Sequence, residues 1–264
     1  MIQEKIEIDK AELTTYILDN YPEIDLNRKR PAVVICPGGA YKLLSDTETE
    51  SIAVKMMSLG FHAFILRYSI KPVIFPQSLI ELAKSMQVIR RNAEKWNIDE
   101  NKIIVAGFSA GGHLAASLGV FWNEAFLKEQ LFGNEQEWKP NGLLLCYPVI
   151  TSGPFAHGSS LQNLLGENYD KLKVKMSLEN QITKDTPATF IWHTVEDQSV
   201  PVENSLLFAN KLQSVGVPFE LHIFPKGIHG LSLATSETTS DPQKIDKAVS
   251  NWPWLFKIWV TENL

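Results

Sequence analysis

Two absences limit what this chain can be: it has little cysteine and no long apolar run. Only two cysteines occur in 264 residues, which excludes a small protein stabilised by a framework of disulfides. Cys36 and Cys146 each lie in an apolar, strand-like stretch, and we expect two buried, reduced thiols. No apolar run is long enough to cross a bilayer, and residues 1–7 contain no apolar core of signal-peptide length. We therefore expect a cytoplasmic protein that does not enter membranes.

The chain also lacks an excess of positive charge and the spacings typical of metal ligands. Lysine and arginine number 25 against 30 aspartates and glutamates, a net charge of −5. No basic stripe is present, so neither nucleic acid nor a membrane surface is an expected partner. No H-E-x-x-H spacing occurs, and we expect no metal and no organic cofactor. The composition, 44% hydrophobic and 21% charged, suits one large domain over residues 1–264 and leaves the oligomeric state open.

Apolar runs alternate with helical patterns along most of the chain. Strands are predicted at residues 5–8, 13–18, 31–36, 61–66, 103–106, 142–146, 188–193 and 219–224. Helices are predicted over about 45–59, from Pro76 onward, over 202–215 and along the aromatic face at 252–260. Ser45 and Glu48 form a predicted capping box for the first helix. The alternation predicts an α/β fold, with a mostly parallel central sheet and helices on both faces.

A sharp turn with a serine at its centre is the most informative segment. Residues 107–111, with the sequence G-F-S-A-G, separate the apolar run at 103–106 from a helix-compatible run that begins at Leu114. Small residues on both sides of Ser109 permit the strained backbone angles of such a turn. The hydroxyl then projects outward, and the first helix amides face any negative charge that forms beside it. We predict a nucleophile elbow with Ser109 as the nucleophile; an ordinary glycine-rich turn is the alternative.

A serine hydroxyl is a weak nucleophile at neutral pH unless a base accepts its proton. The chain has six histidines, and His229 is the predicted base, because it lies in a turn between Gly227 and Gly230 just past the last predicted strand. Asp197, in the loop after the preceding strand, is the predicted acid. The chain order is then serine, acid, histidine. The adjacent Glu196 remains an alternative acid.

Acyl transfer also needs hydrogen-bond donors for the oxyanion of the tetrahedral intermediate. Ala110 supplies the amide directly after the predicted nucleophile. The sequence P-G-G-A-Y at residues 37–41 follows the strand predicted at 31–36, and its adjacent glycines let amides point into a cavity. We expect the amides of Ala110 and of Gly39 or Ala40 to form an oxyanion hole.

Two polar stretches interrupt the alternation of strands and helices. Residues 151–186 separate two predicted strands and begin with a turn-rich loop. Because ligands bind beyond the carboxyl ends of parallel strands, we expect this insertion to form a cap over the site. Ser152 and His157, together with Tyr41, are candidate substrate-binding residues. The second stretch, 232–241, is either a rim of the site or a surface loop.

These segments together resemble the α/β-hydrolase superfamily. The chain looks like a small bacterial carboxylesterase, and within that group it is similar to acetyl-xylan-esterase-like and sugar-deacetylating proteins. The resemblance rests on residues 37–41, the elbow around Ser109, Asp197 followed by Val200-Pro201, and the turn at His229. It implies a Ser-His-Asp triad and hydrolysis of short acyl esters, with acetylated carbohydrate as a possible substrate. The chain departs from the HGGG pattern of lipolytic subgroups, because Pro37 replaces the histidine.

Other functions use the same residues and stay open at this stage. A formamidase or small-amide hydrolase needs the same nucleophile, base and oxyanion donors. A peptidase on this fold is a further alternative, although the chain lacks room for a gating domain. A true lipase is disfavoured, since the expected cap is polar. A non-catalytic binding protein on the same fold would be expected to lose one of the three catalytic side chains, and all three are present.

Overall fold

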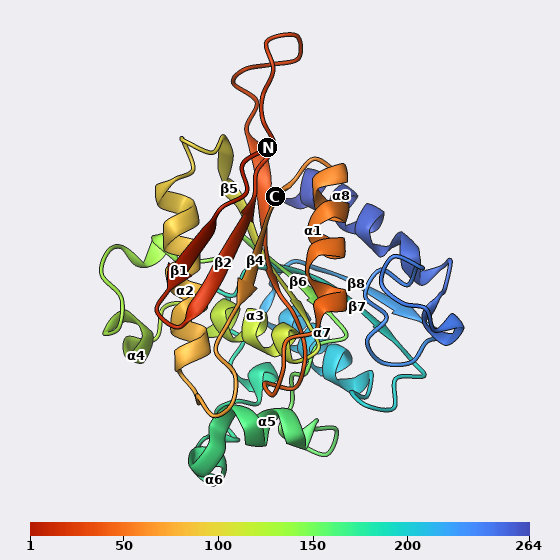
Figure 1. Ribbon diagram of the computed structural model, residues 1–264. Coiled ribbons are helices and arrows are strands. Elements are labelled where there is room, and N and C mark those ends of the chain that lie inside the picture. The colour runs from red at the N-terminus through yellow and green to blue at the C-terminus, as the bar shows by residue number, and fades with distance from the viewer.

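An eight-stranded sheet forms the centre of the molecule (Figure 1). The computed structural model describes residues 1–264. The strands are β1 (Lys5–Ile8), β2 (Ala11–Tyr16), β3 (Arg30–Cys36), β4 (His62–Arg67), β5 (Ile98–Phe108), β6 (Gly142–Cys146), β7 (Ala188–Thr194) and β8 (Phe219–Phe224). Their order across the sheet is β1-β2-β4-β3-β5-β6-β7-β8. Strands β3 to β8 pair in parallel, and β1 and β2 add an antiparallel edge. The predicted mostly parallel sheet is confirmed.

The helices cover both faces of this sheet, as predicted. They are α1 (Glu50–Ser58), α2 (Gln77–Arg91), α3 (Ala110–Phe121), α4 (Ala125–Lys128), α5 (Gly158–Leu165), α6 (Tyr169–Leu172), α7 (Glu203–Val215) and α8 (Trp252–Asn263). One core packs α2, α3 and α7 against one face of the sheet. A second core packs α1 and α8 against the other. Alternate residues of the central strands enter opposite cores, because side chains alternate across a strand; Val34 lies in the first core and Val33 in the second.

The predicted capping box before α1 is wrong. The Ser45 side chain caps no amide, and a 3-10 turn over Asp46–Glu48 precedes the helix, which begins at Glu50. Glu48 is buried and hydrogen-bonds elsewhere. The end of the helix was predicted correctly, since it stops at Ser58 just before Gly60, whose φ is 90°. The sequence pattern S-x-x-E is shared by caps and by other turns, and tertiary contacts decided between them.

The insertion at 151–186 contains α5 and α6, which lie together at the lower side of the sheet in Figure 1. Its α5 packs near the carboxyl end of β3, because the Asn163 amide donates to the Ala40 carbonyl at 2.9 Å. The stretch at 232–241 does not join the insertion; it packs beside the start of α1. There the Ser51 hydroxyl donates to the Glu237 carbonyl and the Ser232 hydroxyl to the Thr47 carbonyl.

Both cysteines are free and buried, Cys36 at the end of β3 and Cys146 at the end of β6. Burial raises the pKa of both thiols, so each remains protonated and behaves as a small apolar side chain. Among the helices, none has the length and hydropathy required to cross a bilayer. No group of three or more His, Cys, Asp or Glu side chains is arranged to hold a metal ion.

Candidate active site

Ser109 lies at the apex of the turn between β5 and α3. Its backbone has φ 52° and ψ −117°, a strained conformation for a residue with a Cβ. Two glycines make the turn possible by close approach. A Cβ on Gly107 would lie 2.1 Å from the Gly111 carbonyl oxygen, and a Cβ on Gly111 would lie 2.1 Å from the Cys36 carbonyl oxygen. The G-F-S-A-G sequence therefore forms the sharp strand-to-helix turn that was predicted.

A continuous chain of hydrogen bonds joins the three predicted catalytic side chains. The Ser109 hydroxyl lies 2.7 Å from His229 Nε2, and His229 Nδ1 lies 2.6 Å from Asp197 Oδ2. An ionised carboxylate only accepts, so Nδ1 carries the ring proton and Nε2 accepts from the serine. The Asp197 side chain is fully buried, while the imidazole of His229 is 21% exposed. The rival carboxylate, Glu196, is exposed and accepts from the Gly227 amide instead.

Four donors surround the Asp197 carboxylate. Oδ1 accepts from the amides of Ser199 and Val200, and Oδ2 faces His193 Nε2 at 3.2 Å as well as His229. Burial alone raises the pKa of Asp197, but hydrogen bonds from the two histidines and from the Val200 amide outweigh it and leave the pKa far below its usual range. The carboxylate therefore stays charged and able to orient the imidazole of His229.

The backbone amides near Ser109 that donate to no acceptor within the protein include those of Gly39, Ala40 and Ala110. Gly39 has φ 128° and Ala40 φ 56°, values that turn the loop after β3 away from regular structure. The carbonyl of Pro37 accepts from the hydroxyl of Tyr68 at 2.6 Å, which fixes one end of this loop. Unpaired amides in a fixed loop are the donors that an oxyanion requires.

A cavity of about 400 Å³ opens above Ser109 and His229. Most of its lining residues are polar in type, and they come from the loop after β3, the elbow, the insertion and the segments after β7 and β8. The lining residues are Gly39, Ala40, Lys42, Leu43, Ser45, Thr47, Glu48, Ser109, His157, Ser199, His229, Gly230 and Lys244. Only two of these, Ala40 and Leu43, are hydrophobic residues.

The three predicted substrate-binding residues are placed differently. His157 lines the cavity, and its Nδ1 lies 2.7 Å from the Ser160 hydroxyl. Partial burial lowers the pKa of His157, so it is neutral near pH 7. Ser152 does not line the cavity; its amide donates to the Ser177 hydroxyl.

The prediction that Tyr41 binds substrate is corrected by the structure. Its side chain is 2% exposed and does not line the cavity. Its hydroxyl lies 3.1 Å from Nδ1 of the buried His113, whose Nε2 lies 3.1 Å from the Met176 carbonyl. A carbonyl only accepts, so Nε2 bears the proton and Nδ1 accepts from the tyrosine. Burial lowers the pKa of His113 to about 4, which keeps this ring neutral. Tyr41 therefore anchors the loop after β3 to α3.

The family follows from comparison with known proteins, since residues 18–212 match BD-FAE. This chain belongs to the BD-FAE family. Over 79% of its length it is 39% identical to the endo-1,4-beta-xylanase B of Butyrivibrio fibrisolvens. Over 77% it is 29% identical to the acetylxylan esterase of Xylanibacter ruminicola. The aligned regions make up 34% and 42% of those two relatives, so this BD-FAE chain spans less than half the length of either.

Solved structures similar to this BD-FAE member cover it almost completely. One is the acetyl ester-xyloside bifunctional hydrolase of Caldicellulosiruptor lactoaceticus, with 39% identity, a TM-score of 0.83, and coverage of 95% of this chain and 87% of that one. Another is the carboxylesterase Cest-2923 of Lactobacillus plantarum, with 27% identity, a TM-score of 0.86 and coverage of 99% and 98%. The predicted α/β-hydrolase fold and the resemblance to acetyl-xylan-esterase-like proteins are confirmed.

Sequence reasoning missed two residues of this BD-FAE site. His193 was not among the predicted site residues, yet its Nε2 lies 3.2 Å from Asp197 Oδ2. Its Nε2 lies 2.9 Å from the Val200 carbonyl, so Nε2 carries a proton, and its Nδ1 lies 2.8 Å from the Ser205 hydroxyl. Glu48 was assigned to a helix cap. A histidine at the carboxyl end of a strand, four residues before the acid, was the available signal for His193.

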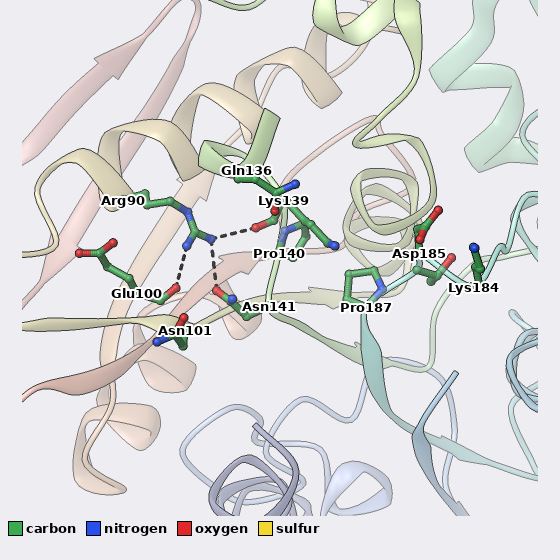
Figure 2. Close-up of a pocket in the computed structure, with 11 residues that line it drawn as sticks. Arg90, Glu100, Asn101, Gln136, Lys139, Pro140, Asn141, Lys184, Asp185 and Pro187 are labelled. Atoms are coloured by element: carbon green, nitrogen blue, oxygen red, sulfur yellow. Dashed lines mark hydrogen bonds between the residues drawn. The ribbon is translucent and has the colours of Figure 1, made fainter. Parts of the chain in front are cut away.

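A larger cavity, of about 560 Å³, lies at the opposite ends of the strands and contains none of the catalytic side chains (Figure 2). No hydrophobic residue lines it. The guanidinium of Arg90 crosses one wall and donates to the carbonyls of Glu100 and Lys139 and to Asn141 Oδ1. These bonds tie α2 to the starts of β5 and β6. We interpret this cavity as a surface hollow of the BD-FAE scaffold, far from Ser109.

Proposed function

We propose that this protein is a serine carboxylesterase that hydrolyses short-chain acyl esters, chiefly acetyl esters. The observation that carries the proposal is the unbroken hydrogen-bond chain from the Ser109 hydroxyl through His229 to Asp197. These hydrogen-bonded side chains lie at a cavity lined mainly by polar residues. The unpaired amides of Gly39, Ala40 and Ala110 lie beside it. A nucleophile, a base, an orienting acid and an oxyanion hole are together sufficient for ester hydrolysis through an acyl-enzyme.

In the first half of the proposed reaction, the Ser109 oxygen attacks the carbonyl carbon while His229 Nε2 takes its proton. The negative charge that develops on the carbonyl oxygen is stabilised by the amides of Ala110 and of Gly39 or Ala40, each contributing roughly 3 kcal/mol. Asp197 stabilises the imidazolium form of His229. The intermediate collapses as the C–O bond to the alcohol breaks, and His229 donates its proton to the departing oxygen.

The second half repeats the chemistry with water. His229 accepts a proton from a water molecule, whose oxygen attacks the acyl-enzyme carbonyl, and the same amides hold the new oxyanion. The Ser109 ester bond then breaks, the serine recovers its proton from His229, and the carboxylic acid leaves. The side chains of this chain balance every proton transfer, so the reaction needs no added cofactor.

Acetylated carbohydrate is the substrate class that we favour. The cavity presents hydroxyl, ammonium and imidazole groups from Ser45, Thr47, Lys42, Lys244 and His157, which suit hydrogen bonds to a sugar. A polar rim of this kind, together with the acetylxylan esterase and acetyl ester-xyloside hydrolase among the similar proteins, supports a role in sugar deacetylation. We propose that the insertion at 151–186 acts as a partial cap, since His157 forms part of the wall.

A serine-directed phosphonate tests the nucleophile directly. We expect such a reagent to label Ser109 alone among the serines, because only this hydroxyl has both an adjacent base and unpaired amides near it. The measurement is peptide mapping of the adduct by mass spectrometry. An adduct on another serine, or none in a preparation that hydrolyses esters, would contradict the proposal.

The acyl-chain preference tests the substrate class. We expect kcat/KM to be highest for acetyl or propionyl esters and to fall steeply by octanoyl. Each buried methylene is worth only about 0.8 kcal/mol, and a long chain gains it only along an extended apolar wall. Ala40 and Leu43 are the two hydrophobic residues that line the cavity. A series of nitrophenyl esters measures this, with acetylated monosaccharides and short xylo-oligosaccharides in parallel. A maximum at eight carbons would contradict the assignment, and a strong preference for N-formyl amides would favour a formamidase.

A further inference from the structure

Glu48 is a buried carboxylate to which the proposed mechanism assigns no role. It is 3% exposed, although it lines the cavity. Oε2 accepts from the Gly38 amide at 2.7 Å, and Oε1 accepts from the Tyr147 hydroxyl at 2.6 Å. A carboxylate is costly to bury unless both oxygens are bonded. These two short bonds meet that requirement and join segments that are far apart in the sequence.

The hydrogen bonds of Glu48 suit its ionised form. The Tyr147 hydroxyl accepts from the Ser232 amide at 3.0 Å and donates its own proton to Glu48 Oε1. The Gly38 amide can only donate. Both Glu48 oxygens therefore face donors, and a carboxylate accepts from both. Burial raises the pKa of Glu48 overall, and the bonds from Tyr147 and Gly38 offset only part of that shift.

On one side, Glu48 fixes the loop that carries the oxyanion donors. A Cβ on Gly38 would lie 2.8 Å from Glu48 Oε2 and 3.0 Å from the Ser109 Cβ. The Gly38 backbone is thus held between the carboxylate and the nucleophile. The bond to Glu48 orients the peptide group between Pro37 and Gly38, whose carbonyl also accepts from the Tyr68 hydroxyl. The directions of the unpaired Gly39 and Ala40 amides depend on that peptide group, because successive peptide planes share a Cα.

On the other side, the same carboxylate reaches the segment that carries His229. The Tyr147 ring packs edge-on against the His229 ring, with centroids 5.1 Å apart and an interplanar angle of 73°. The Tyr147 hydroxyl bonds the amide of Ser232, three residues after the histidine. The Ser232 hydroxyl in turn donates to the carbonyl of Thr47, next to Glu48. Residues 47–48, 147 and 232 are therefore joined in a closed ring of hydrogen bonds.

We propose that Glu48 is a positioning residue that couples the oxyanion loop to the histidine loop through Tyr147 and Ser232. The Glu48 side chain holds the oxyanion loop and the histidine loop together, and both loops must face Ser109. The proposal gives the start of the 232–241 stretch a function, since Ser232 is its first residue. Its catalytic consequence rests on the proposed esterase activity, whereas its structural consequence does not.

The Glu48→Gln variant tests the coupling. Glutamine has the same shape, but it cannot accept from both donors, so we expect kcat to fall about 100-fold with KM nearly unchanged. Inhibition by a boronic acid, whose tetrahedral adduct places an oxygen in the oxyanion hole, should weaken by a similar factor. Amide hydrogen exchange should increase in peptides covering 38–45 and 229–234. The matched control is Glu50→Gln, which changes an exposed glutamate two residues away and should leave all three unchanged.

Tyr147→Phe is the second variant, because it keeps the carboxylate and removes only the bridging hydroxyl. We expect a smaller loss of kcat and faster exchange at 229–234. The kcat of the double variant should be no lower than that of the more impaired single variant, because both changes break the same ring of hydrogen bonds. Wild-type kcat, boronate affinity and exchange in either folded variant would overturn the proposal. If the wild type hydrolyses no ester, the esterase proposal fails instead, and the exchange measurement still decides whether Glu48 joins the two loops.

Discussion

Ser109→Ala is expected to lower kcat for a short acyl ester by about 10⁴-fold or more. His229→Ala should have an effect of the same size, because the hydroxyl and the imidazole act as one unit across their 2.7 Å hydrogen bond. The double variant should lose little beyond either single change. The remaining activity would come from the oxyanion donors and substrate binding alone. Steady-state kinetics with nitrophenyl acetate measure all three variants.

Ser214→Ala serves as the control for this pair. Its hydroxyl caps a carbonyl at the exposed end of α7 and has no part in the site, so its kcat should equal that of the wild type. Circular dichroism of each variant separates loss of catalysis from loss of folding. Losses that multiply in the double variant would mean that one of the two residues acts outside the hydrogen-bonded unit and has been assigned the wrong role.

Asp197→Asn is expected to lower kcat by about 10⁴-fold, whereas Glu196→Gln should have little effect. An asparagine in place of Asp197 can offer its amide group to His229 Nδ1 and so favour the tautomer with the proton on Nε2. That tautomer cannot accept the Ser109 proton. Glu196 is exposed and bonds only the Gly227 amide, so neutralising it leaves the imidazole in place. The two variants alter adjacent residues and make the same chemical change, a carboxylate replaced by an amide.

Kinetics at a fixed pH, with both variants folded, decide between the two carboxylates. The opposite ranking, a severe Glu196→Gln and a mild Asp197→Asn, would transfer the orienting role to Glu196. Asp197→Asn also leaves His193 Nε2 facing an amide in place of a charge. Its thermal unfolding therefore needs measuring alongside kcat, because a buried site with an altered partner loses stability as well as activity.

Local patterns in the sequence predicted much of the fold. Strand periodicity located all eight strands, and the alternation of strands with helices implied the parallel sheet. The positions of strand ends were less certain: the run predicted at 103–106 forms part of β5, which extends over Ile98–Phe108. Those extra residues are polar at 99–102, and they lie at a register shift, because β3 pairs with Ile98 and then again from Ile103 onward. The family resemblance, carried by the elbow and the glycine turn, is confirmed by the match to BD-FAE.

The sequence by itself determined the elements that depend on neighbouring residues. Small residues around Ser109 dictate the sharp turn, and chain order places the acid and histidine loops at the same edge of a parallel sheet. Tertiary structure alone decided how side chains from distant segments meet. Tyr41 follows a glycine turn that suggested a ligand contact, yet its hydroxyl bonds His113. Glu48 matched a helix cap in sequence, yet it bonds Gly38 and Tyr147. A buried polar group takes whichever partners the packed fold brings within reach, and local sequence does not encode those distances.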